Sequence, residues 1–116
     1  MSWSDDDIFG DAAIVEPRVL VSEHRFNLEQ IAAAVTVRIY KHLSGSDDAR
    51  FSFETSHHIH TPEQMGPYVP SAPWYDEPGY ALHRAVDSIV SYYRTAVEAG
   101  HVPNREWLVP NELFQA

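Results

Sequence analysis

The stretch Asp76–Gly100, DEPGYALHRAVDSIVSYYRTAVEAG, is the strongest structural signal in this chain. Its apolar residues recur every three to four positions, which is the spacing of one face of an α-helix. Asp76 can cap such a helix, Pro78 is tolerated in a first turn, and Gly100 is a natural end. We therefore predict an amphipathic helix over Asp76–Gly100. Its apolar stripe consists of Leu82, Ala85, Val86, Ile89, Tyr93, Ala96 and Val97.

A second amphipathic helix is predicted over Phe26–Gly45. Asn27 takes the N-cap position, and Gln30 stands three residues later, as in a capping box. Gly45 suits the position that follows a helix end. The apolar residues of this segment repeat at helical spacing, and they are Leu28, Ile31, Ala32, Val35, Ile39 and Leu43.

Two further segments favour β-strands. Arg50–His60 alternates with a period of two, which is typical of a strand with one polar face. Ala12–Glu23 is rich in Val, Ile and Leu. Proline cannot donate to a ladder, so Pro17 makes this segment either an edge strand or two short strands. The apolar side of Arg50–His60 would carry Phe51, Phe53, Thr55, His57 and Ile59.

These elements predict an α+β fold, in which two amphipathic helices pack on a small β-sheet. A long loop rich in proline and aromatic residues would join the main strand to the second helix. The length of 116 residues fits one domain, which we place at residues 12–116. Residues 1–11, MSWSDDDIFGD, carry four aspartates and no base, and are predicted to form a flexible acidic tail.

The charge balance limits the partners of the chain. It holds 17 acidic and 8 basic residues, for a formal net charge of −9. Direct nucleic-acid binding needs clustered Lys and Arg, so we predict none and expect a protein partner with a basic surface. The chain has no cysteine and no apolar run of about 18 residues that could cross a membrane. Its first residues lack a basic and then apolar pattern, so we expect no signal peptide and a cytoplasmic location.

The histidine run His57-His58-Ile59-His60 suggests one alternative function. On a strand, His58 and His60 would share a face about 6–7 Å apart. With Glu63 as a third ligand they would suit a metal-binding protein or a small metal-dependent enzyme. Closed structural sites need further ligands, so we predict no metal and no other cofactor.

The loop Thr61–Asp76 is the other candidate site. Pro67, Pro70 and Pro73 have the spacing of a polyproline II segment. Interleaved aromatic residues on a stiff backbone are typical of interface centres, which favours partner binding through this loop. In the alternative interpretation, the same rings cover the second helix and close a small core.

No hydrolase, zinc-protease or phosphate-loop motif is present, so we favour a function that is not enzymatic. We predict a protein-binding module that modulates or inhibits a larger partner, in the manner of immunity proteins or of phage inhibitors of nucleic-acid-handling complexes. A structural or assembly subunit is a further alternative, and a homodimer remains open. The predicted partner-binding residues are Tyr68, Trp74, Tyr75, Asp5, Asp6, Asp7 and Glu54.

Overall fold

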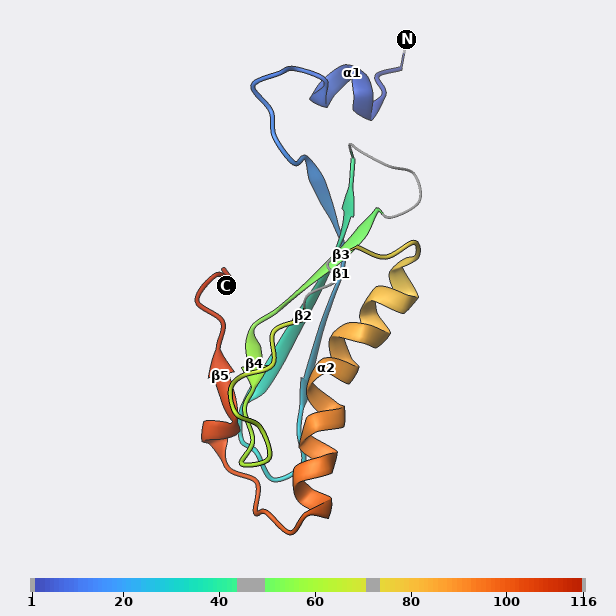
Figure 1. Ribbon diagram of the computed structural model, residues 1–116. Helices are drawn as coiled ribbons and strands as arrows, with labels where there is room; N and C mark the ends of the chain where they lie inside the picture. Colours follow the sequence, from blue (N-terminus) through green and yellow to red (C-terminus); the bar gives the residue numbers. More distant parts are fainter. Residues whose placement is uncertain (1, 44–49, 71–73, 116) are drawn as a thin grey trace.

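The computed structural model describes residues 2–43, 50–70 and 74–115. Strands β1, β2 and β3 form an antiparallel sheet in that order, and β4 pairs with β5 in a second small sheet. The long helix α2 lies along one face of the larger sheet (Figure 1). In chain order the elements are α1 (Asp5–Phe9), β1 (Arg18–Asn27), β2 (Ala34–His42), β3 (Phe51–Thr55), β4 (His57–Ile59), α2 (Pro78–Glu98), the 3-10 helix η1 (Arg105–Trp107) and β5 (Leu108–Pro110).

The α+β class is confirmed, but the helix predicted over Phe26–Gly45 is wrong. The described part of this segment holds the end of β1, a turn and the strand β2. Its apolar residues Ile31, Val35 and Ile39 are four apart, and a spacing of four fits a strand as well as a helix. Val37 decides between them, because it is buried beside Val35 and Ile39 although a helix would turn it away from their face. Gln30 has a φ of 67°, which belongs to a turn.

Strand β2 is the centre of the core. Val35, Val37 and Ile39 are fully buried on the face that α2 covers. Phe53 of β3 lies opposite Ile39, which confirms the predicted alternation in this strand. The buried apolar cluster consists of Leu28, Ile31, Val35, Val37, Ile39, Ile59, Tyr75, Ala81, Ala85, Ile89, Ala96, Trp107 and Leu108.

The predicted strand Arg50–His60 is divided at Ser56. The backbone N–H of Ser56 donates to Thr36 O at 2.9 Å, and the Ser56 hydroxyl accepts from Thr36 N at 2.8 Å. The Ser56 carbonyl then accepts from Asn111 N at 2.9 Å, which leads the chain away from β2. From His57 onward it pairs with β5, so that Ile59 lies opposite Leu108.

Helix α2 is close to its prediction. Glu77, rather than Asp76, is the N-cap and accepts from Tyr80 N at 2.7 Å, while Pro78 takes the first turn. The helix ends at Glu98, and Gly100 follows with a φ of 94°, a left-handed conformation that favours glycine. Its buried residues are Ala81, Ala85, Ile89 and Ala96, of which Ala81 was not in the predicted stripe. Val97 of that stripe is 41% exposed.

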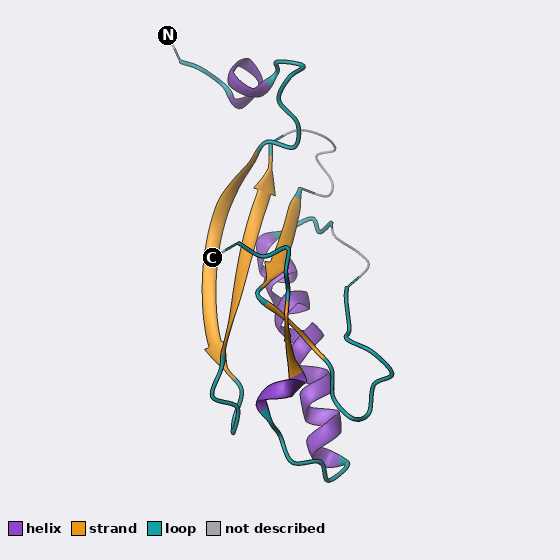
Figure 2. Ribbon diagram, turned by 90° about the vertical axis from the view of Figure 1, so that its left-hand side faces the viewer, coloured by secondary structure: helices purple, strands orange, loops and turns teal. Residues whose placement is uncertain are grey.

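The N-terminal part of the chain consists of the short helix α1 and the edge strand β1. The strand predicted over Ala12–Glu23 lies at a sheet edge, but its predicted bounds are wrong. Strand β1 begins at Arg18, directly after Pro17, and runs to Asn27, so Pro17 lies outside the strand. The short helix α1 lies within the predicted acidic tail and has no buried residue. Figures 1 and 2 show α1 apart from α2, beyond the end of the sheet where β1 begins. The flexibility of residues 1–11 stays a prediction.

Candidate functional site

One face of the three-stranded sheet is not covered by α2 (Figure 2). Since Val35, Val37 and Ile39 point toward the helix, the alternate residues of β2 point away from it. The strand register adds the neighbours of these residues on β1 and β3. We call this surface the open face, and it carries Arg18, Leu20, Glu23, Arg25, Thr36, Arg38, Tyr40, His42, Ser52 and Glu54.

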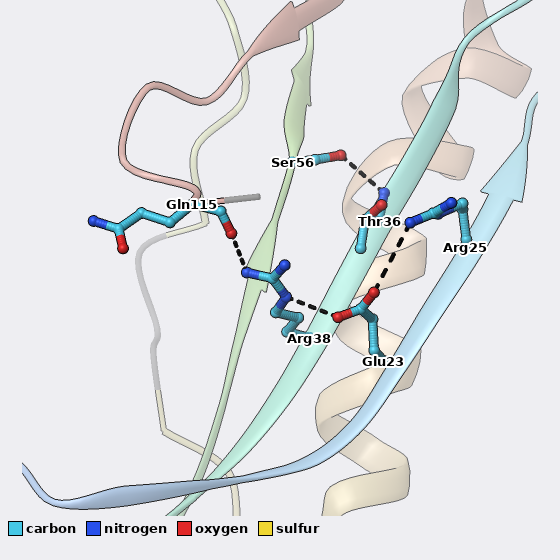
Figure 3. A network of polar contacts seen from close by, with 6 residues as sticks. All are labelled: Glu23, Arg25, Thr36, Arg38, Ser56 and Gln115. Carbon is cyan, nitrogen blue, oxygen red and sulfur yellow. Dashed lines mark hydrogen bonds and ion pairs between the residues drawn. The ribbon is translucent and has the colours of Figure 1, made fainter.

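Ion pairs cross the open face. Arg18 Nη1 lies 3.2 Å from Glu54 Oε1. Arg38 Nε donates to Glu23 Oε2 at 3.0 Å, and Arg25 Nη2 lies 4.0 Å from the other oxygen of Glu23 (Figure 3). Three of the eight basic residues of the chain therefore lie on this face, and each of them contacts an acid.

Arg18 and Arg38, which are each paired with an acid, also contact aromatic rings. The Arg18 guanidinium carbon lies 4.2 Å from the centre of the Tyr40 ring. That of Arg38 lies 4.3 Å from the ring of Phe114, in the C-terminal segment that follows β5, and Arg38 also donates to the carbonyl of Gln115. Arg, Tyr and Trp are the residue types enriched at the energetic centres of interfaces.

Two hollows adjoin the open face, and they share Glu54 and the exposed Leu113. The first, of about 370 Å³, lies between the ion pairs and the C-terminal segment, and is lined by Arg18, Arg38, Tyr40, Glu54, Leu113 and Gln115. The second has a volume of about 240 Å³. It is lined by Phe53, Glu54, Thr55, His58, Val69, Pro70, Asn111 and Leu113. The predicted partner-binding residue Glu54 thus forms part of the wall of both.

The predicted aromatic loop divides between core and surface. Tyr75 is buried and forms a backbone bridge with Phe51, with N–H···O distances of 3.0 and 2.9 Å in the two directions. Tyr68 is half-buried, with its ring centre 4.8 Å from that of Tyr92. Trp74 is 48% exposed. The last residue of the Pro67-Pro70-Pro73 pattern lies outside the described residues.

Trp74 stands at one end of the open face. Its ring is edge-on to His42, with ring centres 4.4 Å apart. His42 is buried under this ring, and its Nε2 is 2.7 Å from Ser52 Oγ. Two of the predicted residues, Trp74 and Glu54, therefore lie on the open face or at its rim, whereas Tyr75 packs on the core side against Phe53.

The three predicted aspartates lie on α1, beyond the end of the sheet where β1 begins (Figure 1). Arg18, the first residue of β1, is in register with His42, which contacts Trp74. Asp7 accepts from Ser4 N at 3.1 Å and from Ser4 Oγ at 2.9 Å. These bonds lower the pKa of the Asp7 carboxyl, the backbone bond most. Asp5 and Asp6 are exposed in the first turn, where acids suit the helix dipole.

The histidine run does not assemble the predicted metal ligands. His58 lines the smaller hollow, whereas His60 Nε2 lies 3.3 Å from Gln64 O. Glu63 Oε1 instead pairs with His101 Nε2 at 2.6 Å. In the part of the chain that the structure describes, no group of three or more His, Asp or Glu residues is arranged to hold a metal ion. The metal-dependent alternative therefore has no ligand set there.

Partial burial lowers the pKa of three histidines below the usual 6.5, and it is the main cause for His42, His57 and His58. Nearby Arg18 adds to the effect at His42, and Arg105 adds to it at His57. Folding therefore favours the neutral imidazole. The corresponding stability is complete above pH 6.5 and is lost as the pH falls toward the lowered pKa of the folded state.

We expect melting temperatures to fall between about pH 7 and pH 5 with a contribution from His42. His42→Gln should melt lower at neutral pH, since it alters the contacts with Trp74 and Ser52, but should lose less stability over this interval. The exposed His83 supplies the matched substitution His83→Gln on α2. Identical pH dependence in His42→Gln and the wild type would contradict a role for His42.

Arg18, Arg38 and Tyr40 were not predicted from the sequence. The signal for Arg38 and Tyr40 is their alternation with buried β-branched residues, which is visible once the segment is treated as a strand. Among the described residues, no helix has the length and apolar character needed to span a membrane. Comparison of the chain with family models, curated proteins and solved structures gives no significant match.

Proposed function

We propose that this protein is a non-enzymatic protein-binding module, which modulates or inhibits a larger partner and engages it through the open face. The observation that carries the proposal is Trp74, whose ring is about half exposed and rests edge-on against His42. A large ring already held by a neighbour loses little conformational entropy when it is buried by a partner. Trp is also the residue type most typical of binding hot spots.

The surroundings of Trp74 support the same role. Arg18 and Arg38 are held in place by acids and aromatic rings, so their guanidinium groups are oriented before a partner arrives. The 240 Å³ hollow has Val69, Pro70 and Leu113 in its wall, with His58 and Asn111 as polar groups. This combination suits an apolar side chain inserted by the partner.

The charge of −9 supports a partner with a basic surface. Long-range attraction between opposite charges mainly raises the rate of association and contributes less to the final affinity. The three aspartates of α1 are exposed and lie beyond the end of the sheet where β1 begins. A cytoplasmic nucleic-acid-handling complex is a suitable partner class, because such proteins have basic grooves.

Trp74→Ala is expected to weaken partner binding by about 2 kcal/mol, roughly 30-fold in Kd, mainly through faster dissociation. Its melting temperature should fall only slightly, because the ring is half exposed, although its contact with His42 is lost. Trp3→Ala is the matched control, since Trp3 is 72% exposed and lies ahead of α1. This control should bind like the wild type.

The experiment is affinity capture from the native host with tagged wild type, Trp74→Ala and Trp3→Ala, followed by binding kinetics on the purified partner. Neutralising Asp5, Asp6 and Asp7 together should slow association and leave dissociation unchanged, and added salt should have the same effect on the wild type. Equal recovery of the partner by all variants would rule out Trp74 as the binding anchor. Unfolding of the domain by Trp74→Ala would show that its ring belongs to the core.

A further inference from the structure

Strand β1 is exposed along nearly its whole length. Eight of its ten residues are exposed, among them Val19, Leu20 and Val21 at 47, 47 and 45%. Within the described chain, β1 pairs with β2 on one side only, whereas the free side of β3 is partly closed by the bridge from Phe51 to Tyr75. An unpaired edge of this length is a template for another strand.

The backbone groups at the free edge follow from the register. Leu43 N donates to Pro17 O at 2.9 Å, so the carbonyl of Pro17 points toward β2. Because the direction alternates along an antiparallel strand, Arg18 and Leu20 direct their backbone groups to the free side. The bulge between Leu20 and Ser22 shifts this alternation by one residue. As a result, Glu23 and Arg25 also direct their backbone groups to the free side.

Two charged residues of β1 would face opposite charges on a second copy of β1 that runs antiparallel to it. Arg18 and Glu23 are placed symmetrically about the Leu20–Val21 bond and carry opposite charges. Arg18 is in register with His42 and Glu23 with Arg38, so both side chains lie on the open face. In a regular strand, two residues five apart would point to opposite faces, and the bulge is what brings them to the same one.

We propose that β1 pairs antiparallel with β1 of a second copy of this chain, centred between Leu20 and Val21. In this register Arg18 faces Glu23 of the partner subunit. The two sheets become one, with both α2 helices on the same side and the two open faces joined. The contact does not use Trp74, although Arg18 belongs to both surfaces. Its test measures the mass of this protein alone, so it can fail separately from the proposed function.

Across the joined sheet the charges alternate in sign. Glu54, Arg38 and Glu23 lie in adjacent strands of one copy, and Arg18 of the partner subunit would come next. Charged side chains and bulges commonly protect sheet edges against pairing. Opposite charges directly across a strand pair stabilise it, so the charges of β1 would favour pairing with an antiparallel copy of β1. They would disfavour pairing with a strand whose charges are arranged differently.

The proposal is tested by measuring the molar mass of the protein by light scattering as it elutes from a size-exclusion column. The buffer holds about 0.15 M salt, at which the Debye length is about 8 Å and repulsion between two acidic copies is screened. The wild type should reach twice the monomer mass as its concentration rises. Arg18→Glu alone and Glu23→Arg alone should remain monomers, since each sets like charges against each other. An equimolar mixture of the two variants should form dimers, because both pairs in the mixed dimer have opposite charges.

Arg94→Glu, on the exposed side of α2, is the matched charge reversal and should dimerise like the wild type. Leu20→Glu changes an exposed residue at the centre of the contact and should abolish the dimer with an unchanged circular dichroism spectrum, and it decides the question if a reversal variant misfolds. A monomeric wild type, a dimer that survives Leu20→Glu, or folded reversal variants that stay monomeric when mixed would each overturn the proposal.

Discussion

Trp107→Ala is expected to lower the free energy of unfolding by about 3–5 kcal/mol, the largest loss that we expect from a single substitution here. Trp107 is 3% exposed, and its ring lies edge-on to Tyr93 of α2 with ring centres 5.9 Å apart. Its carbonyl accepts from His60 N at 2.8 Å beside β4. The side chain therefore joins the smaller sheet to the helix, and its removal leaves a cavity at that junction.

Chemical denaturation monitored by circular dichroism measures this loss, and the melting temperature should fall by roughly 10–20 °C. Trp3→Ala removes the same side chain from a position that is largely exposed, so it should change the unfolding free energy by less than about 0.5 kcal/mol. Similar losses in the two variants would show that Trp107 is not part of the core.

Ile89→Ala is expected to cost about 2–4 kcal/mol of stability. Ile89 is 1% exposed on the side of α2 that packs against β2 and β3, and it belongs to the stripe predicted from the helical period. Ile89→Val should cost about 0.5–1.5 kcal/mol, because less volume is removed. The series therefore reports how tightly the helix packs on the sheet.

Ile14→Ala is the matched control for Ile89→Ala, because Ile14 is 40% exposed and precedes β1. It should cost less than about 1 kcal/mol, since little apolar surface is uncovered. A loss at Ile14 equal to that at Ile89 would mean that the phase of α2 is wrong.

Helix α2 could be predicted from the sequence because its signals come from residues close together in the chain. Its 3.6-residue period continues over several turns, and Pro78 and Gly100 mark its ends. Pro17 marks the start of β1 in a similar way, because proline cannot donate to a ladder and the strand begins at the next residue. The alternation of Phe51, Phe53 and Thr55 likewise identified β3.

The residues of the candidate site could be predicted from the sequence only in part. Trp74 and Glu54 were found from residue type and pattern, and both lie at the open face or its rim. Tyr75 has the same aromatic character as Trp74 but is part of the core. Consecutive residues of an extended segment point to opposite sides, so only the packing of α2 on one side of the sheet separates the two rings.

Tertiary packing alone decided the state of residues 34–42 and the division at Ser56. The spacing of Ile31, Val35 and Ile39 satisfies both the helical and the strand period, and strand pairing on both sides of β2 resolves the ambiguity in favour of the strand. At Ser56 the chain changes sheets through bonds to Thr36 and Asn111, which are distant in sequence. Such partners leave no local trace, because their contribution depends on loops closed only in the folded chain.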